Sequence, residues 1–149
     1  LDLSALAHEV AAPMLAAVPG TLPRLSVAAG LRASADPVLI RVVLENLLSN
    51  AFKYSARTPE PVVEVGRLAG DAPVIFFIRD NGKGFDMRQA GLLFQPFQRL
   101  HDRHEFAGLG VGLSTVQQIV ARHGGRIWCE ALPERGATFY FTLQAAARG

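Results

Sequence analysis

Residues 38–52 have the apolar spacing of a buried helix, but two asparagines interrupt it four residues apart. Residues three and four apart lie on one side of a helix, so Asn46, Asn50 and Lys53 are expected on one narrow face. Tyr54 is expected beside it. Buried amides need polar partners. A phosphate–metal ligand would provide them, because amide oxygens bind Mg²⁺ and lysine neutralises phosphate charge. Bonds from the asparagines to a neighbouring loop are the alternative.

Composition indicates one soluble domain, residues 1–149, half of them hydrophobic. Apolar runs such as residues 74–78 are far shorter than the roughly 20 residues of a membrane-spanning helix. A net charge of +2 with scattered basic residues argues against a nucleic-acid-binding surface. The single cysteine, Cys129, excludes an internal disulfide and fits a reducing compartment. Because the chain begins with Leu1, we expect it to be a fragment of a longer protein.

The order of helix and strand patterns predicts the fold class. Asp36 before Pro37 predicts the N-cap of the asparagine-bearing helix. Other helices are predicted at residues 2–17, 87–94 and 113–123, and strands at 24–29, 62–68, 73–79, 126–132 and 138–144. This order predicts an α/β (α+β) two-layer sandwich, a mixed sheet with about three helices on one face.

Two glycine-containing segments are candidates for ligand binding. In DNGKGFD, residues 80–86, Asp80 ends a buried strand and can accept a hydrogen bond from an exocyclic amine. Gly82 and Gly84 would let a flat ring approach the backbone. A hairpin turn is the alternative, but no matching strand follows directly. GLGVG, residues 108–112, opens a predicted helix, whose N-terminus can bind phosphate, although a flexible linker has similar glycines.

Two histidine-containing segments are not predicted to be sites. His101, Asp102, His104 and Glu105 imitate a metal cluster, but their segment is weakly periodic and has no matching distant ligand. His123, beside a Gly-Gly pair, is predicted to end a helix, where the helix dipole favours it.

Together the motifs resemble the ATP-binding catalytic domain of bacterial sensor histidine kinases. The segment that resembles the N box of this family is ENLLSNAFKYS (45–55). The segment that resembles its first glycine box is DNGKGFD (80–86). The segment that resembles its F box is LFQPFQRLH (93–101). The second glycine box is matched by GLGVGLSTVQQIVARHGGRIW (108–128), and the closing strand of the family is matched by GATFYFTL (136–143). The F box and RHGGRIW are most similar to the phytochrome-like and multi-sensor branch. The resemblance implies the Bergerat ATP-binding fold, with residues 94–108 as a mobile ATP lid.

The resemblance also implies roles for individual residues, with ATP and Mg²⁺ as cofactors. Asn50 would be the Mg²⁺ ligand, while Asn46 and Lys53 would serve catalysis. Asp80 would accept the adenine amino group, and Thr138 would lie near the base. The full set of implied cofactor-binding residues is Asn50, Tyr54, Asp80, Gly82, Gly84, Phe94, Phe97, Gly108, Gly110, Val111, Gly112, Leu113 and Thr138.

Departures from the family pattern refine the expected activity. Leu109 replaces the threonine common between the first two glycines of GLGVG. In gyrase-like and chaperone relatives, a glutamate four residues before the metal asparagine activates water. Asn46 stands at that position here, and Glu45 would point away from the Asn50 face. This favours phosphoryl transfer to a histidine over hydrolysis, because imidazole is itself a nucleophile.

The resemblance therefore implies the catalytic part of a protein histidine kinase. It would position Mg²⁺–ATP for transfer to a histidine on a separate dimerisation domain of the same protein, which then feeds a response regulator. We expect a cytoplasmic location, no nucleic acid and no membrane contact by this domain. The alternatives are a non-kinase or serine-kinase member of the same ATPase fold, and a degenerate interaction module that no longer binds nucleotide.

HEVAAP, residues 8–13, imitates the phosphoacceptor box of the same kinases. A phosphoacceptor histidine belongs on a long helical hairpin, and a strand-like run follows too closely for one here. His8 is therefore interpreted as an ordinary helix residue, and the isolated chain is not expected to phosphorylate itself.

Overall fold

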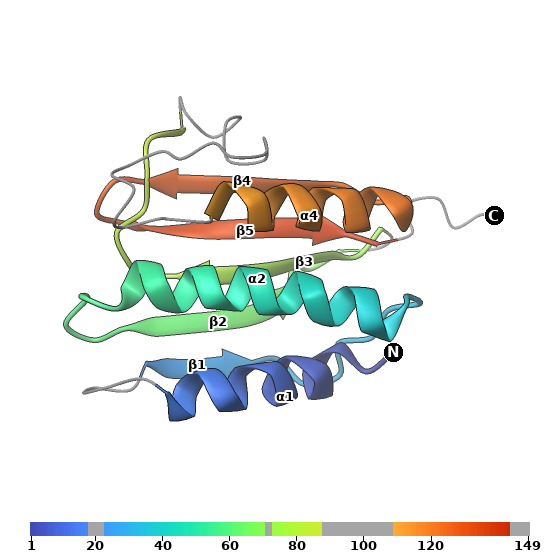
Figure 1. Cartoon of the computed structure of the whole chain (residues 1–149), viewed down its shortest axis with the longest axis horizontal. Coiled ribbons are helices and arrows are strands. Elements are labelled where there is room, and N and C mark those ends of the chain that lie inside the picture. The colour runs from blue at the N-terminus through green and yellow to red at the C-terminus, as the bar shows by residue number, and fades with distance from the viewer. Residues whose placement is uncertain (18–22, 71–72, 88–108, 144–149) are drawn as a thin grey trace.

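The computed structural model describes residues 1–17, 23–70, 73–87 and 109–143. In these residues a single mixed sheet of five strands has its helices on one face (Figure 1). The helices are α1 (Leu3–Ala16), α2 (Pro37–Ser55) and α4 (Leu109–Arg122). The strands are β1 (Arg24–Val27), β2 (Val62–Arg67), β3 (Ile75–Asp80), β4 (Ile127–Leu132) and β5 (Gly136–Thr142). The predicted two-layer α/β sandwich is confirmed.

The strand order is β1-β2-β3-β5-β4, and only the β1–β2 pair is parallel. Parallel neighbours need a crossover connection, and α2 supplies it between β1 and β2. The crossover lays α2 across the middle of the sheet, between α1 and α4 (Figure 1). The helix that carries both asparagines is thus the central helix of its layer.

The helix starts test two sequence predictions. The carboxylate of Asp36 accepts the backbone N–H of Val38 at 2.8 Å, and Pro37 is the first helical residue, so the predicted cap is confirmed. Helix α4 begins at Leu109, not at Leu113, so that predicted start is wrong. Glycine disfavours helix locally, but packing against α2 outweighs that preference. The helix predicted at residues 87–94 falls almost entirely outside the described residues.

The core lies between the helices and the facing side of the sheet. Helix α2 buries one side completely, with Ile40, Val43, Leu44 and Leu48 at 0 % exposure. They meet alternating sheet residues and the inner side of α4, which include Val63, Val65, Phe76, Ile78, Phe139, Phe141, Leu113, Val116 and Val120. Each large aliphatic side chain buried in this way contributes about 1.5–3 kcal/mol.

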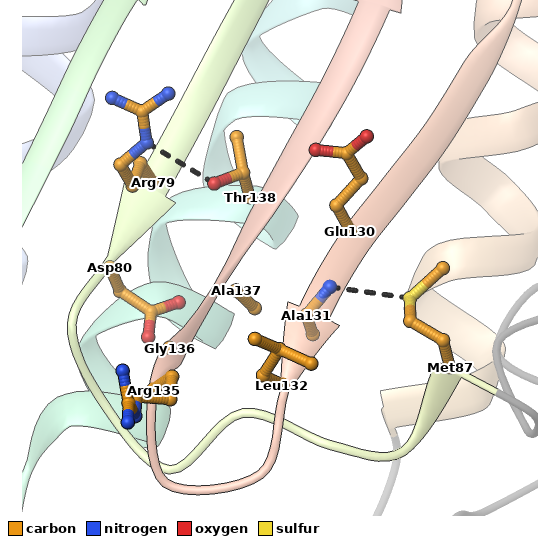
Figure 2. A pocket seen from close by; sticks show the side chains of 10 residues that line it. All are labelled: Arg79, Asp80, Met87, Glu130, Ala131, Leu132, Arg135, Gly136, Ala137 and Thr138. Carbon is orange, nitrogen blue, oxygen red and sulfur yellow. Dashed lines mark hydrogen bonds between the residues drawn. The ribbon is translucent and has the colours of Figure 1, made fainter.

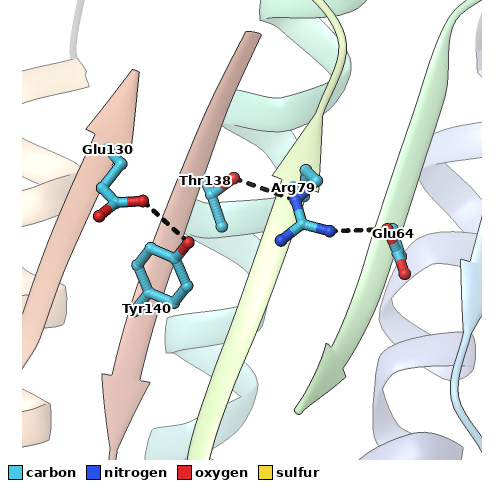
Figure 3. A network of polar contacts seen from close by, with 5 residues as sticks. All are labelled: Glu64, Arg79, Glu130, Thr138 and Tyr140. Carbon is cyan, nitrogen blue, oxygen red and sulfur yellow. Dashed lines mark hydrogen bonds and ion pairs between the residues drawn. The ribbon is translucent and has the colours of Figure 1, made fainter. Parts of the chain in front are cut away.

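No described helix covers the outer face of the sheet, whose own side chains shield it instead. A polar network there joins four strands through Glu64, Arg79, Thr138, Tyr140 and Glu130 (Figure 3). The guanidinium of Arg79 lies 4.5 Å from the ring centre of Phe77, which is only 6 % exposed. Tyr140 stacks on Trp128 at 5.5 Å. The outer face is therefore largely shielded by its own residues.

Across the described ranges, no helix combines the length and the hydropathy required to cross a membrane.

His123 joins the end of α4 to the start of α2. Its Nε2 accepts the backbone N–H of Asp36 at 3.1 Å, and its Nδ1 lies 2.9 Å from the carbonyl oxygen of Ile119. Because Nε2 accepts, Nδ1 must carry the proton and donate. Helix α4 ends at Arg122, one residue before the predicted end at His123.

We predict that His123→Ala lowers the free energy of unfolding by about 1–2 kcal/mol, since two hydrogen bonds are lost at a half-buried site. Urea unfolding monitored by circular dichroism measures the change. Arg122→Ala is the matched control, because Arg122 is exposed and adjacent, and its effect is expected to stay within about 0.5 kcal/mol. Equal effects of the two substitutions would contradict the role of His123.

Candidate nucleotide-binding site

The two asparagines of α2 have different surroundings. Asn50 is only 6 % exposed, and among the described residues no hydrogen bond reaches its side-chain amide. A buried polar group without a partner costs about 1–3 kcal/mol, so Asn50 is suited to a ligand that supplies one. Its amide oxygen is a ligand type that Mg²⁺ accepts. Asn50 thus fits the predicted metal-binding role.

Asn46 contacts α4. Its Nδ2 donates to the carbonyl oxygen of Val42 at 2.8 Å, and its Oδ1 lies so close to Gly112 that a Cβ there would overlap it. Asn46 thus bonds within its own helix and packs against a second helix, and among the described residues neither asparagine bonds to a neighbouring loop, which was the alternative drawn from sequence. The predicted catalytic role of Asn46 stays a prediction. Lys53 and Glu45 are both exposed.

Asp80 places a carboxylate at the end of β3, where it is 4 % exposed. It accepts the backbone N–H of Gly82 at 2.8 Å and the backbone N–H of Ala137. Burial raises the pKa of Asp80 to about 7, while those two hydrogen bonds act in the opposite direction. A donor such as an amino group would favour the ionised form, so the carboxylate is suited to accept one.

Tyr54 connects the end of α2 with Asp80. The ring is 5 % exposed and lies edge-on to Phe85 at 6.3 Å. Burial raises the pKa of the Tyr54 hydroxyl well above its usual value, and the nearby charge of Asp80 raises it further. The ends of α2 and β3 therefore meet, and Tyr54 forms part of the wall between them.

The two glycines of DNGKG are required by the path of the backbone. A Cβ on Gly82 would overlap the carbonyl oxygen of Tyr54, and one on Gly84 would overlap that of Leu132. Gly84 also has a φ of +64°, which side chains disfavour. The chain thus passes between α2 and the β4–β5 turn, a role that sequence reasoning missed. Approach of a flat ring to these glycines stays a prediction.

The start of the second glycine box, from Leu109, forms the first turn of α4. Helices α2 and α4 are antiparallel, so the start of α4 lies at the same end of the helical layer as the end of α2 (Figure 1). First-turn N–H groups lack partners within a helix and attract anions. Gly110 and Val111 belong to this turn, whereas Leu113 is fully buried in the core. Phe94, Phe97, Gly108, the predicted lid and the His101–Glu105 cluster lie outside the described residues.

Thr138 lies on β5, one residue beyond the residue that pairs with Asp80. In the β3–β5 register Asp80 pairs with Ala137, and Arg79 pairs with Thr138. Paired residues share a face, so Thr138 lies on the face opposite to the Asp80 side chain. Its Oγ1 accepts from Arg79 Nε at 3.2 Å. The predicted place of Thr138 near the base stays a prediction, and Ala137 is the residue that pairs with Asp80.

A hollow of about 430 Å³ lies at the ends of β3, β4 and β5 (Figure 2). Its lining residues are Arg79, Asp80, Met87, Glu130, Ala131, Leu132, Arg135, Gly136, Ala137 and Thr138. Arg79, Thr138 and Glu130 are register neighbours on the outer face of the sheet. Neither Asn50 nor Lys53 lines the hollow, so we assign the candidate nucleotide site to the helical face instead.

Binding of a metal ion at this site would depend on a bound nucleotide. Within the described ranges, no group of three or more His, Cys, Asp or Glu side chains could hold a metal ion. Asn50 alone offers a buried amide oxygen there. This donor set fits Mg²⁺, which is commonly held by few protein ligands together with substrate phosphates and water.

Comparisons with known proteins find relatives among phytochromes and sensory kinases. Cyanobacterial phytochrome A of Nostoc sp. is 39 % identical over 106 residues, which cover 71 % of this chain and 14 % of that protein. The adaptive-response sensory kinase SasA of Synechococcus elongatus is 37 % identical over 127 residues, which cover 85 % of this chain and 30 % of that protein. The chain thus spans less than a third of the length of either relative.

Two solved structures show the same fold. The catalytic domain of histidine kinase ThkA superposes with a TM-score of 0.77 at 23 % identity, covering 97 % of this chain and 93 % of that one. Full-length ShkA in complex with AMPPNP gives 0.78 at 26 % identity, covering 100 % of this chain and 31 % of that one. The fold is therefore the Bergerat fold that the resemblance implied.

The family model described as histidine kinase-, DNA gyrase B- and HSP90-like ATPase matches residues 35–147, which include all three parts of the candidate site, namely the end of α2, the end of β3 and the start of α4. The chain belongs to this ATPase family.

Proposed function

We propose that this chain is the ATP-binding catalytic domain of a sensor histidine kinase. It would hold Mg²⁺–ATP for transfer of the γ-phosphate to a histidine on a separate dimerisation domain. The observation that carries the proposal is a pair of buried polar groups suited to a ligand. Asn50 has no partner among the described residues, and burial raises the pKa of the Asp80 carboxyl.

The adenine and the phosphates of ATP each have matching groups on the helical face. The Asp80 carboxylate accepts the adenine amino group, and Tyr54 walls the site between α2 and β3. Lys53, exposed at the end of α2, contacts the phosphates, and the first turn of α4 binds them through backbone N–H groups. When bound through Asn50, Mg²⁺ neutralises phosphate charge. The domain therefore contributes positioning and charge neutralisation.

The surroundings of Asn46 support phosphoryl transfer over hydrolysis. Asn46 stands where hydrolysing members of the family carry a water-activating glutamate. Its amide nitrogen is bonded to Val42 and its oxygen packs on Gly112, so it offers no base. Glu45 is exposed. Relatives named as kinases support the same choice, among them a methanogenesis regulatory histidine kinase of Methanothrix harundinacea, 40 % identical over 112 residues.

The partners follow from this reaction. The nucleophile is a histidine of the dimerisation domain, and a response regulator in the cytoplasm receives the phosphoryl group. His8 is a poor substitute for that histidine, because its helix α1 belongs to the same domain as the nucleotide site. The His8 side chain is exposed there.

We expect ATP binding to require Mg²⁺ and Asn50. A fluorescent ATP analogue should bind more tightly with Mg²⁺ than with EDTA, and Asn50→Ala should abolish that difference. Because the Asn50 amide has no described partner to lose, the variant should unfold within about 1 kcal/mol of wild type in urea. Glu45→Gln, an exposed change on the same helix, is the control. Equal wild-type affinity with Mg²⁺ and EDTA would contradict the metal role.

Asp80→Asn should strengthen folding at high pH and weaken nucleotide binding. The pKa of Asp80 rises from 3.8 to about 7 on folding, so the unfolded chain releases its proton first. The wild-type free energy of unfolding therefore falls as pH rises from about 4 to 7. Asparagine removes this loss, a gain of at most about 4 kcal/mol at pH 8, reduced because one acceptor oxygen is lost.

The same substitution should weaken ATP and ADP alike, by about ten- to a hundredfold, because a hydrogen bond to a charged group disappears. Urea unfolding between pH 4 and 8 and nucleotide titration measure the two effects. A stability difference between wild type and variant that stays constant across this pH range would refute the linkage.

The isolated chain should not phosphorylate itself, because in-line geometry needs a histidine outside this compact unit. Incubation with γ-labelled ATP is expected to give no acid-labile phosphohistidine. Addition of the dimerisation segment of the parent protein should restore labelling on that segment. Label on the isolated chain that vanishes in His8→Gln would show instead that His8 is the acceptor.

A further inference from the structure

Asn81 links the segment after β3 to the loop that precedes β2. Its Oδ1 accepts the backbone N–H of Val62 at 2.9 Å, and its Nδ2 donates to the carbonyl oxygen of Glu60 at 2.8 Å. Its backbone N–H donates to the carbonyl oxygen of Val62 at 3.3 Å. Three hydrogen bonds thus hold one residue against two positions of the neighbouring chain.

These bonds continue the sheet past its last regular pair. The β2–β3 register ends where Val63 pairs with Asp80. Beyond that pair, the side-chain amide of Asn81 provides the donor and the acceptor that a further peptide group would supply in a regular ladder. Asn81 itself is exposed, and its three hydrogen bonds all go to residues 60 and 62 and not to the helical face. Its contribution is to the backbone and not to a bound ligand.

The backbone that Asn81 holds controls the Asp80 carboxylate. Gly82, the next residue, donates its N–H to Asp80 Oδ1 at 2.8 Å. Lys83 then donates its backbone N–H to the carbonyl oxygen of Tyr54 at 3.0 Å, at the end of α2. Loss of the Asn81 side chain would leave only the long backbone bond to Val62 on this side of the segment, so the Gly82 N–H would be held less firmly against the carboxylate.

We propose that Asn81 is a positioning residue for base recognition, which holds the Asp80 carboxylate where it meets the amino group of a 6-aminopurine. This inference rests on the proposed function, and it adds the loop at residues 60–62 to the support of the base site. Its consequence is selectivity. Loss of Asn81 should lower the preference for ATP over ITP, which has a carbonyl oxygen where ATP has the amino group.

The test compares wild type, Asn81→Ala and Ser4→Ala. Ser4 is a matched control, because its hydroxyl also makes two bonds to backbone, to Ala28 at 2.6 Å and from Leu31 at 2.9 Å, beside β1. Dissociation constants for ATP and ITP are measured by titration. Asn81→Ala should lower the ITP-to-ATP ratio of dissociation constants about tenfold, equivalent to one charged hydrogen bond. Ser4→Ala should leave the ratio unchanged.

A second measurement needs no nucleotide. Hydrogen exchange of the Gly82 amide should accelerate at least about tenfold in Asn81→Ala and stay at the wild-type rate in Ser4→Ala. If Asn81→Ala fails to fold, Asn81→Asp replaces it, because it keeps an acceptor for Val62 while losing the donor to Glu60.

The outcomes separate this inference from the proposed function. Wild type that binds ATP, with an unchanged nucleotide ratio or unchanged Gly82 exchange in the variant, overturns the role of Asn81 alone. Wild type that binds neither ATP nor ITP overturns the proposed function and the base-recognition role together.

Discussion

The burial of the Asp80 carboxylate at the end of β3 is the constraint on which the site depends. An ionisable group that is 4 % exposed needs partners, and the backbone N–H groups of Gly82 and Ala137 supply two. Those partners are in reach only because the chain is packed backbone to backbone. A Cβ on Gly136, whose φ is +98°, would overlap the Asp80 carbonyl oxygen. The glycines around Asp80 are therefore required by the backbone packing that brings hydrogen-bond donors to the carboxylate, whether or not a ligand is bound.

Helix α2 brings the second buried polar group to the same end of the molecule. As the crossover between β1 and β2 it must lie across the sheet, and Asn50 near its end is buried without a described partner. Contacts along the helix fix α4 beside it, through Asn46 against Gly112 and His123 against Asp36. The position of the first turn of α4, which we propose binds phosphate, thus depends on contacts as far away as the opposite end of α4.

The sequence predicted most of the fold, because hydrophobic periodicity and capping residues act locally. Asp36 and Pro37 marked the start of α2, and apolar spacing marked its length. The start of α4 was missed because glycine has a low helix propensity. The contact with Asn46 that favours the helix there is made by a residue far away in the sequence. The bond between Thr138 and Arg79 was not predicted, because the two residues lie 59 positions apart in the sequence.

Among the site residues, too, those marked by a local pattern were predicted and those defined by distant partners were not. Asn50 and Asp80 stood out because polar groups interrupt apolar patterns, and both are buried in the structure. Asn81 and His123 did not, since their partners lie 19 and 87 residues away in sequence. Nothing local distinguishes a turn asparagine from one that extends a sheet, or a helix-ending histidine from one that joins two helices.

The most direct test of the central claim is the pKa of Asp80 measured by ¹³C NMR of its side-chain carboxyl, with and without saturating Mg²⁺–ATP. The account predicts a pKa of about 7 in the free domain, because the carboxyl is buried. It predicts a fall well below that value with ATP, since an amino group that donates to the carboxylate favours its ionised form. An Asp80 pKa that does not change when ATP is bound would contradict recognition of adenine by this carboxylate.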